Sequence, residues 1–199
     1  MLGLPKSVEL LKQLPKKSIY EKFDMNTAAK EKFDADISRI NIVAEITPNT
    51  VSIEKGETVT AIYVLQAILK RKEFNPNTIS QIFKLINQNM LLVLDCDGER
   101  KLAIHHTKLI HSDWKLTDDS SVSLTGLNLD TVWENLITQV GGIEIEQGHS
   151  LDEQIASDEQ KAKLEKEIAR LERMARNEKQ PKKKFELVQQ IKKLKGVLG

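Results

Sequence analysis

The sequence predicts an α+β protein in which a mixed β-sheet is covered by helices and is followed by a C-terminal antiparallel helical hairpin. Apolar residues alternate with polar ones along residues 40–47, which is the period of a β-strand. Farther along the chain, an Asn-Pro dipeptide marks the start of one predicted helix and a Gly-Gly dipeptide marks the end of another. Residues 150–199 are rich in charge and carry apolar residues three and four positions apart. We therefore expect a globular α+β domain over residues 1–149 and a coiled-coil-like hairpin over 150–199.

The first part of the chain reads as two helices and two strands. Ser7 can cap a short helix that Pro15 ends, and a second helix is expected over residues 27–35. The alternation over residues 40–47 predicts a strand with one more polar face. After the Pro48-Asn49 turn, Val51 and Ile53 predict a short second strand.

The centre of the chain predicts a buried strand and a hairpin. Residues 58–69 are apolar on both faces of an extended chain, so helices or another layer must cover both faces. Asn75-Pro76 pairs a capping residue with a proline at the first helical position, which predicts a helix. Residues 90–95 and 101–107 predict two strands, joined at Asp97-Gly98 by a type I′ turn.

The last third of the chain reads as three helices. Asp130 or Thr131 is expected to cap the first, which ends at Gly141-Gly142. Ser150 and Glu153 form the pattern of a capping box at the start of a long charged helix. A break at Gln180-Pro181 separates it from a second helix, and two consecutive helices with narrow apolar stripes indicate an antiparallel hairpin.

The apolar stripes of the hairpin are candidate partner-binding surfaces. Each stripe is too narrow to lie deep in a core, so the two helices need each other, the globular domain or another protein. The candidate partner-binding residues are Leu164, Ile168, Leu171, Phe185, Leu187, Ile191 and Leu194.

Basic residues concentrate near the C-terminus. From Ser150 onward there are 13 basic and 9 acidic residues, and between Arg176 and Lys195 there are 8 basic and 2 acidic ones, although the whole chain has a net charge of only +1. Such a run can bind phosphates, or it can simply solvate a coiled hairpin. Phe185 is the only aromatic residue within it, so base reading is not supported. The candidate nucleic-acid-binding residues are Arg176, Lys179, Lys182, Lys183, Lys184, Lys192 and Lys193.

Other polar residues give no catalytic or metal-binding pattern, and we expect no cofactor. The single cysteine excludes an internal disulfide and a thiolate cluster. A zinc ion needs three or four ligands within about 2.0–2.3 Å of one point, whereas neighbours on a strand point to opposite faces. The phosphate-binding glycine motifs are absent, and no serine stands at a strand-turn-helix elbow. The polar cluster considered for a metal comprises Asp95, Cys96, Asp97, His105, His106 and His111.

The order of the expected elements also matches the core of many metal-dependent nucleases. Such a core needs an acidic residue on its second strand and Glu-x-Lys on its third, so that carboxylates hold the metal. Residues 61–67 contain no carboxylate, and Glu45 and Glu54 stand without a strand partner. A nuclease-like fold would therefore be inactive here.

The expected location is the cytoplasm. Residues 1–6 contain no long apolar core of the kind that a signal peptide has. No apolar run approaches the roughly 20 residues that a membrane helix requires, so no membrane association is expected.

Several short stretches resemble a family of bacterial and archaeal proteins that is classed as a domain of unknown function. The clearest are Glu178-Lys179-Gln180 and the following Phe185-Glu186-Leu187. Leu14-Pro15-Lys16 with Tyr20, residues 40–53, and residues 62–70 are also similar to it. Asn41 stands where the family tends to have tryptophan, and Ala61 lies near a position that tends to be acidic. The resemblance implies a neighbourhood of helicases and DNA methyltransferases of restriction or phage-defence type, and it implies no reaction.

Three hypotheses follow. The first is a non-enzymatic accessory or adaptor protein that binds a partner protein, such as a helicase or a DNA methyltransferase, through the hairpin. The second is a nucleic-acid-binding module that uses the basic face of the hairpin. The third is a divergent nuclease-like domain, in which Glu45 and Glu54 are the only candidate acids.

Overall fold

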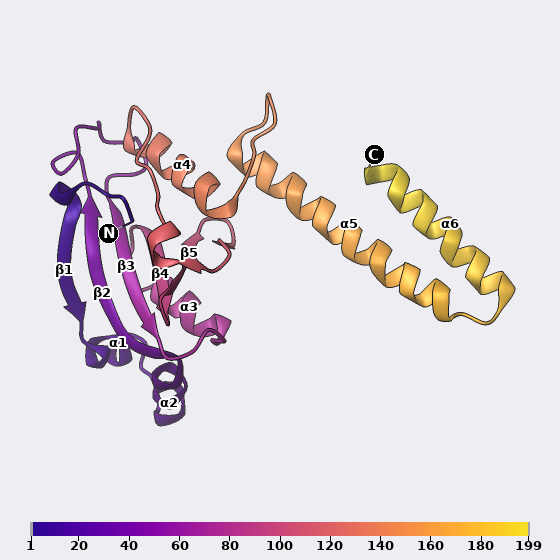
Figure 1. Cartoon of the computed structure of the whole chain (residues 1–199), viewed down its shortest axis with the longest axis horizontal. Coiled ribbons are helices and arrows are strands. Elements are labelled where there is room, and N and C mark those ends of the chain that lie inside the picture. The colour runs from indigo at the N-terminus through magenta and orange to yellow at the C-terminus, as the bar shows by residue number, and fades with distance from the viewer. Residues whose placement is uncertain (1, 199) are drawn as a thin grey trace. The chain divides into compact units, whose positions relative to one another are not determined.

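The computed structural model describes residues 2–198, which divide into two compact units with the boundary between Ile143 and Glu144. Figure 1 shows the course of the chain. We call residues 2–143 the sheet unit and residues 144–198 the hairpin unit. The predicted boundary at residues 149 and 150 lies a few residues farther along the chain.

The sheet unit contains a mixed β-sheet and four α-helices among its described residues. Its strands are β1 (Glu9–Leu14), β2 (Ile37–Ile46), β3 (Ile62–Leu69), β4 (Asn89–Cys96), β5 (Glu99–His105), β6 (Leu109–His111) and β7 (Lys115–Leu116). Its helices are η1 (Lys6–Val8), α1 (Lys16–Lys22), α2 (Thr27–Asp36), α3 (Pro76–Phe83), η2 (Thr117–Asp119) and α4 (Leu129–Gly141), where η marks a short 3-10 helix. The hairpin unit consists of a lead-in segment followed by α5 (Leu151–Asn177) and α6 (Pro181–Leu198). The predicted α+β class with a C-terminal helical hairpin is confirmed.

The strands lie in the order β1-β2-β3-β4-β5-β6, and β7 also pairs with β5. All pairs are antiparallel except β3 and β4, which run parallel. Parallel neighbours need a crossover connection, and α3 supplies it between β3 and β4. The Asp97-Gly98 turn joins β4 to β5, and both of its residues have positive φ, as a type I′ turn requires.

One face of the sheet packs against α1, α2 and α3. Ile19 of α1, Phe33 of α2 and Ile79 of α3 are fully buried in a single apolar cluster with residues of β2, β3 and β4. Leu65 and Leu92 come from neighbouring strands into this cluster. Burial of such side chains contributes about 1.5–3 kcal/mol each, so this layer stabilises the unit strongly.

The opposite face of the sheet is covered in part. Ile62, Val64 and Leu91 alternate with the residues of the first cluster and are also fully buried, so a second layer lies over them. Leu2 and Leu4 border a small cavity with Val64, and α4 lies against β5 and β6. The prediction of a strand apolar on both faces and covered on both faces is confirmed, although β3 begins at Ile62 rather than at residue 58.

The predicted N-terminal helix capped by Ser7 is wrong. Residues 9–14 form the edge strand β1, which pairs with β2, and only Lys6–Val8 turn as a short 3-10 helix. A segment this short cannot repay the cost of helix nucleation, whereas the edge of β2 offers it backbone hydrogen bonds. Helix α1 after Pro15 was not predicted.

The predicted strand at Val51 and Ile53 is also wrong, and the start of α4 differs from the prediction. Residues 51–61 contain no strand: the Val51 N–H group donates to the Thr47 carbonyl oxygen (3.1 Å) in the turn after β2, and Glu54 forms only an isolated bridge with Asn128. Farther along, the Asp130 carboxylate accepts hydrogen bonds from the backbone N–H groups of Glu57 (2.6 Å) and Val59 (2.8 Å). Asp130 therefore binds this loop instead of capping α4. The cap is Asn128, whose side chain accepts a hydrogen bond from the Thr131 N–H group.

Candidate functional site

The hairpin carries the residues that the sequence singles out, and its first helix begins as predicted. The Ser150 hydroxyl accepts a hydrogen bond from the Glu153 N–H group, and the Glu153 carboxylate accepts one from the Ser150 N–H group at 2.8 Å. Both orphan donors at this helix end are thereby satisfied. After Asn177 the chain leaves the helix, and the Gln180 N–H group donates to the Glu178 carboxylate before α6 begins at Pro181.

The apolar stripes of α5 and α6 lie on the surfaces along which the two helices pack. Ile168, Leu171 and Ala175 are buried, and the remaining stripe residues, Leu164, Leu187, Ile191 and Leu194, are half-buried. The two helices contact each other, and Lys195 of α6 binds Glu172 of α5 at 2.8 Å. The hairpin therefore uses most of its apolar stripe internally. Whether any of these residues also binds a partner stays a prediction.

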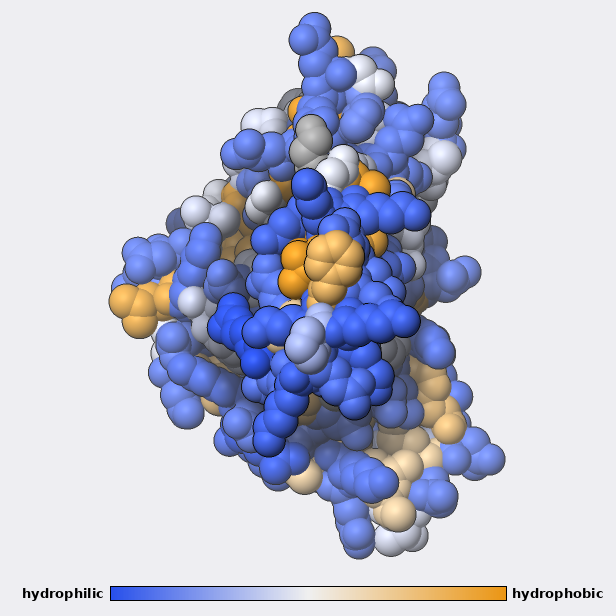
Figure 2. Space-filling model, turned by 90° about the vertical axis from the view of Figure 1, so that its right-hand side faces the viewer, coloured by the Kyte–Doolittle hydropathy of each residue, from blue (hydrophilic) through white to orange (hydrophobic). Residues whose placement is uncertain are grey.

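Phe185 differs from the other candidate partner-binding residues, because 63% of it is exposed. Val188, one turn farther along α6, is 47% exposed, and Met174 of α5 is 44% exposed. Figure 2 shows the hydrophobic side chains of the visible surface as small separate areas among hydrophilic ones. Phe185 and Val188 are exposed three positions apart on α6, which makes them neighbours on the helix surface.

All seven candidate nucleic-acid-binding residues are exposed. Some charges of α5 are paired within the helix, Lys163 with Glu159 and Arg170 with Glu167. In the described part of the chain, Lys182, Lys183 and Lys184 make no ion pair, and the first turn of α6 contains no acidic residue. These three lysines are therefore available to an anionic ligand.

A row of polar side chains crosses the sheet unit, and sequence reasoning did not find it. The Asn41 side chain of β2 donates to the side-chain amide oxygen of Gln66 on β3 (3.2 Å). The side-chain amide nitrogen of Gln66 donates to the Asp95 carboxylate of β4 (3.1 Å). Arg100 of β5 donates to the same Asp95 oxygen, also at 3.1 Å. Asp95 and Arg100 face each other across the β4–β5 hairpin, whereas Asn41, Gln66 and Asp95 are far apart in sequence and meet only through the strand register. Their mutual hydrogen bonds satisfy polar groups that would otherwise be costly on a partly buried face.

The two acidic residues considered for a nuclease, Glu45 and Glu54, have different structural roles. The Glu45 carboxylate accepts a hydrogen bond from the Tyr63 hydroxyl at 2.7 Å, which raises the pKa of Tyr63. Glu54 lies in the turn region, where its backbone forms an isolated bridge with Asn128. Within residues 2–198, no group of three or more histidine, cysteine or acidic side chains is arranged to hold a metal ion. Cys96 is buried in the core, and burial is the main cause that raises the pKa of its thiol.

Two residues of the N-terminal resemblance have a structural role. Lys16 and Tyr20 of α1 both donate to Asp34 of α2, at 2.5 and 2.6 Å. Burial of the phenol and its hydrogen bond to Asp34 raise the pKa of Tyr20 to about 12. Burial alone would raise the pKa of Asp34, but the bonds from Lys16 and Tyr20 outweigh it and lower that pKa. The contacts tie α1 to α2.

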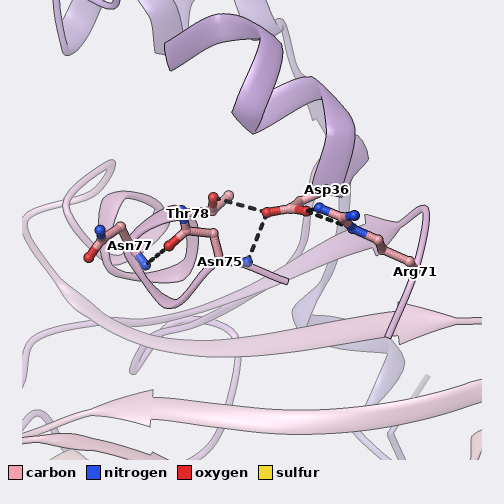
Figure 3. A network of polar contacts seen from close by, with 5 residues as sticks. All are labelled: Asp36, Arg71, Asn75, Asn77 and Thr78. Atoms are coloured by element: carbon pink, nitrogen blue, oxygen red, sulfur yellow. Dashed lines mark hydrogen bonds and ion pairs between the residues drawn. The ribbon is translucent and has the colours of Figure 1, made fainter. Parts of the chain in front are cut away.

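Asp36, at the end of α2, is the most deeply buried acidic residue among those described. One carboxylate oxygen accepts two hydrogen bonds from the Arg71 guanidinium, and the other accepts bonds from the Asn75 N–H group and the Thr78 hydroxyl. Figure 3 shows these contacts converging on the carboxylate. Burial works to raise its pKa, but the Asn75 and Arg71 bonds lower it. This carboxylate fixes the start of α3 to the end of α2 and is fully engaged.

No helix in the described part of the chain is long and apolar enough to cross a membrane. Searches of the curated proteins and of the solved structures found no match. A family model described as "Domain of unknown function (DUF4391)" matches residues 2–198. The match covers nearly the whole chain, including the sheet unit and the hairpin unit, so the chain belongs to the DUF4391 family.

Proposed function

We propose that this chain is a non-enzymatic accessory or adaptor protein that docks onto a partner protein through its C-terminal hairpin. The observation that carries the proposal is the exposed surface of α6. There Phe185 and Val188 stand outside the packed stripe and are surrounded by lysines. Exposed aromatic side chains beside charged ones are typical of interface hot spots.

The charge of α6 indicates an acidic partner surface. Lys182, Lys183 and Lys184 occupy the first turn of the helix, where the positive end of the helix dipole disfavours cations. These lysines weaken the isolated helix, and they make no ion pair within the described residues that would offset this effect. Their position is explained if a negatively charged surface lies against them in a complex.

The family resemblance supports a partner from DNA-processing or phage-defence machinery, specifically a helicase or a DNA methyltransferase. Such a partner would provide the catalysis, and this chain would provide a contact. The protein would then act in the cytoplasm, where these enzymes meet DNA.

The test combines recovery from the native host with a matched pair of variants. Phe185→Ala and Val197→Ala each remove an apolar side chain of α6 that is 63% exposed, and the two positions are on different sides of the helix. We expect Phe185→Ala to weaken binding to the recovered partner about tenfold or more, as truncation of a hot-spot residue does. Val197→Ala should bind as the unchanged protein does. Recovery of the protein as a lone, stable monomer would contradict the proposal.

The unpaired lysines favour a second candidate function, binding of nucleic acid. Each phosphate contact contributes about one unit to the slope of log affinity against log salt concentration. Replacing Lys182, Lys183 and Lys184 together by glutamate should abolish retention of DNA or RNA at low salt. Unchanged retention would exclude this function. Phe185→Ala separates the candidates, since it should weaken a protein partner and leave phosphate binding nearly intact.

Metal-dependent cleavage is the function that the site supports least. The expected nuclease-like order of helix, three strands, helix and strand is not observed, because α1 and α2 stand between β1 and β2 and residues 51–53 form no strand. Asn41 and Gln66 also place neutral amides opposite each other on β2 and β3, and amides lack the charge that binds Mg²⁺ best. Divalent-metal-dependent cleavage that disappears in Glu45→Gln or Glu54→Gln would revive this function.

A further inference from the structure

A hollow of about 400 Å³ lies in the sheet unit, where β4 begins and β5 ends. The last turn of α3 and the segment that follows it form one side, and the end of β5 with Trp133 of α4 forms the other. Its volume falls in the range of small-molecule sites, roughly 300–1,000 Å³. All residues that line the hollow belong to the sheet unit, and none belongs to the hairpin unit.

The polar lining of the hollow favours an anionic ligand that also accepts and donates hydrogen bonds. Lys84 is exposed at its border, and Asn87, Gln88 and Asn89 contribute three side-chain amides in succession. Among the described residues that line the hollow there is no carboxylate. A cation would find no countercharge there, whereas a phosphate would find a lysine. The amides can both donate and accept at the edge of a planar ring.

The aromatic lining favours a flat ligand. The Phe83 ring lies against the His105 ring with centroids 5.9 Å apart and planes tilted by 49°. His105 is exposed and Phe83 is half-buried, so the pair presents ring surface to the hollow. Trp133 also borders the hollow, although it is only 6% exposed. A base stacks on such rings whatever its sequence, because every base has a π face.

We propose that this hollow binds a nucleotide. The base would stack on the Phe83 and His105 rings, the amides of Asn87 and Gln88 would meet its edge, and Lys84 would bind the phosphate. Inorganic phosphate would use only Lys84 and leave the aromatic pair without a role. The proposal is independent of the hairpin, so it stands or falls separately from the proposed docking function.

The test uses the full chain and adenosine 5′-monophosphate as the probe. The chain has two tryptophans, so Trp114→Phe leaves Trp133 as the sole one. We expect the nucleotide to change Trp133 fluorescence in a saturable way and to shift the side-chain amide resonances of Asn87 and Gln88. Isothermal calorimetry gives the affinity independently.

Two exposed residues of the hollow give the decisive variants, and each has a matched control elsewhere. His105→Ala and Lys84→Gln should each weaken nucleotide binding about fivefold or more, as loss of one stacking or phosphate contact does. His111→Ala and Lys32→Gln change exposed residues of the same types outside the hollow and should leave the affinity unchanged. Circular dichroism checks that each variant is folded.

Several outcomes would overturn the proposal. The first is the absence of any fluorescence, resonance or calorimetric change up to about 10 mM nucleotide, because any binding would then be weaker than a millimolar dissociation constant. Ribose 5-phosphate binding as tightly as the nucleotide would exclude the base-stacking role of Phe83 and His105. Adenosine binding as tightly as the nucleotide would exclude the phosphate role of Lys84.

Discussion

Asp36 and Tyr20 show how single polar residues hold the sheet unit together. Each is bound to groups from another part of the chain, Asp36 to the segment that starts α3 and Tyr20 to Asp34 of α2. Their bonds connect elements that the apolar cluster alone would position less uniquely, since hydrogen bonds are directional and burial is not. The resulting predictions concern stability.

Replacing Asp36 by alanine should destabilise the protein by about 2–4 kcal/mol. The change leaves the Asn75 N–H group and the buried Thr78 hydroxyl without their partner, and loss of a partner costs a buried group about 1–3 kcal/mol. Arg71 is 59% exposed and can return to water, so the loss stays below that of a fully buried ion pair. Urea unfolding measures it. Asp113→Ala removes an exposed carboxylate and should have almost no effect, and equal losses for the two variants would contradict the structural role of Asp36.

The folded protein should resist ionisation of its tyrosines. The pKa of Tyr20 is raised to about 12, so Tyr20 should stay protonated at pH 10, where an unfolded tyrosine is half ionised. The pKa of Tyr63 is raised as well, so Tyr63 should ionise at a higher pH than an unfolded tyrosine. Because the folded pKa of Tyr20 is the higher one, its contribution to stability is complete below about pH 10 and is lost as pH rises toward about 12. Tyrosinate absorbance during an alkaline titration measures this. Ionisation of both tyrosines with the ordinary midpoint of about pH 10, while the native circular dichroism is retained, would contradict the raised pKa values.

At the scale of elements, the loop between β2 and β3 shows how a helix can replace a strand partner. Asp130 in the first turn of α4 binds the backbone of Glu57, Thr58 and Val59 and the Thr58 hydroxyl. These bonds lower the pKa of Asp130, the Thr58 hydroxyl contributing most. The donors of residues 57–59 are therefore satisfied by α4, and β3 begins only at Ile62 rather than at residue 58.

Gly56 allows this close approach, so Gly56→Ala should destabilise the protein by about 1–3 kcal/mol, as other overpacking changes do. A Cβ atom at position 56 would lie 2.3 Å from an Asp130 carboxylate oxygen. The Asp130 side chain would have to move away from the backbone N–H groups that it now binds. Gly196→Ala is the control, because nothing lies near a Cβ atom there and alanine is the better helix former. Thermal unfolding distinguishes the two, and a neutral Gly56→Ala would show that Asp130 does not hold the loop.

At the scale of the whole molecule, the chain consists of two units that differ in how they are stabilised. The sheet unit has fully buried apolar residues on both faces of β3, whereas the hairpin unit relies on one narrow stripe and on surface ion pairs. Surface pairs contribute little each, so the hairpin should be the less stable unit.

Limited digestion with a glutamate-specific protease should cut the chain first after Glu144. Residues 143–150 contain no helix or strand, and Glu144 is exposed there. The expected products are the sheet unit and a fragment that contains α5 and α6, which mass spectrometry would identify. First cleavage at Glu54 or Glu57 instead would contradict the placement of the boundary and show that the Asp130 loop opens more readily.

Local sequence signals determined much of this fold. The capping box at Ser150, the Asn75-Pro76 helix start, the Asp97-Gly98 turn and the alternation over residues 40–47 all specify structure through neighbours a few residues apart. The spacing of the hairpin stripes likewise specified α5 and α6, because helical periodicity is a local property.

Only the tertiary structure decided the rest. Residues 9–14 became a strand because the edge of β2 was available to them, and residues 57–59 bind Asp130 of α4 instead of extending β3. The polar row from Asn41 to Arg100 and the hollow beside Phe83 and His105 depend on strand register and on α3 and α4. Such long-range pairings leave no periodic trace in the sequence, since any residue can meet another once the chain has folded back on itself.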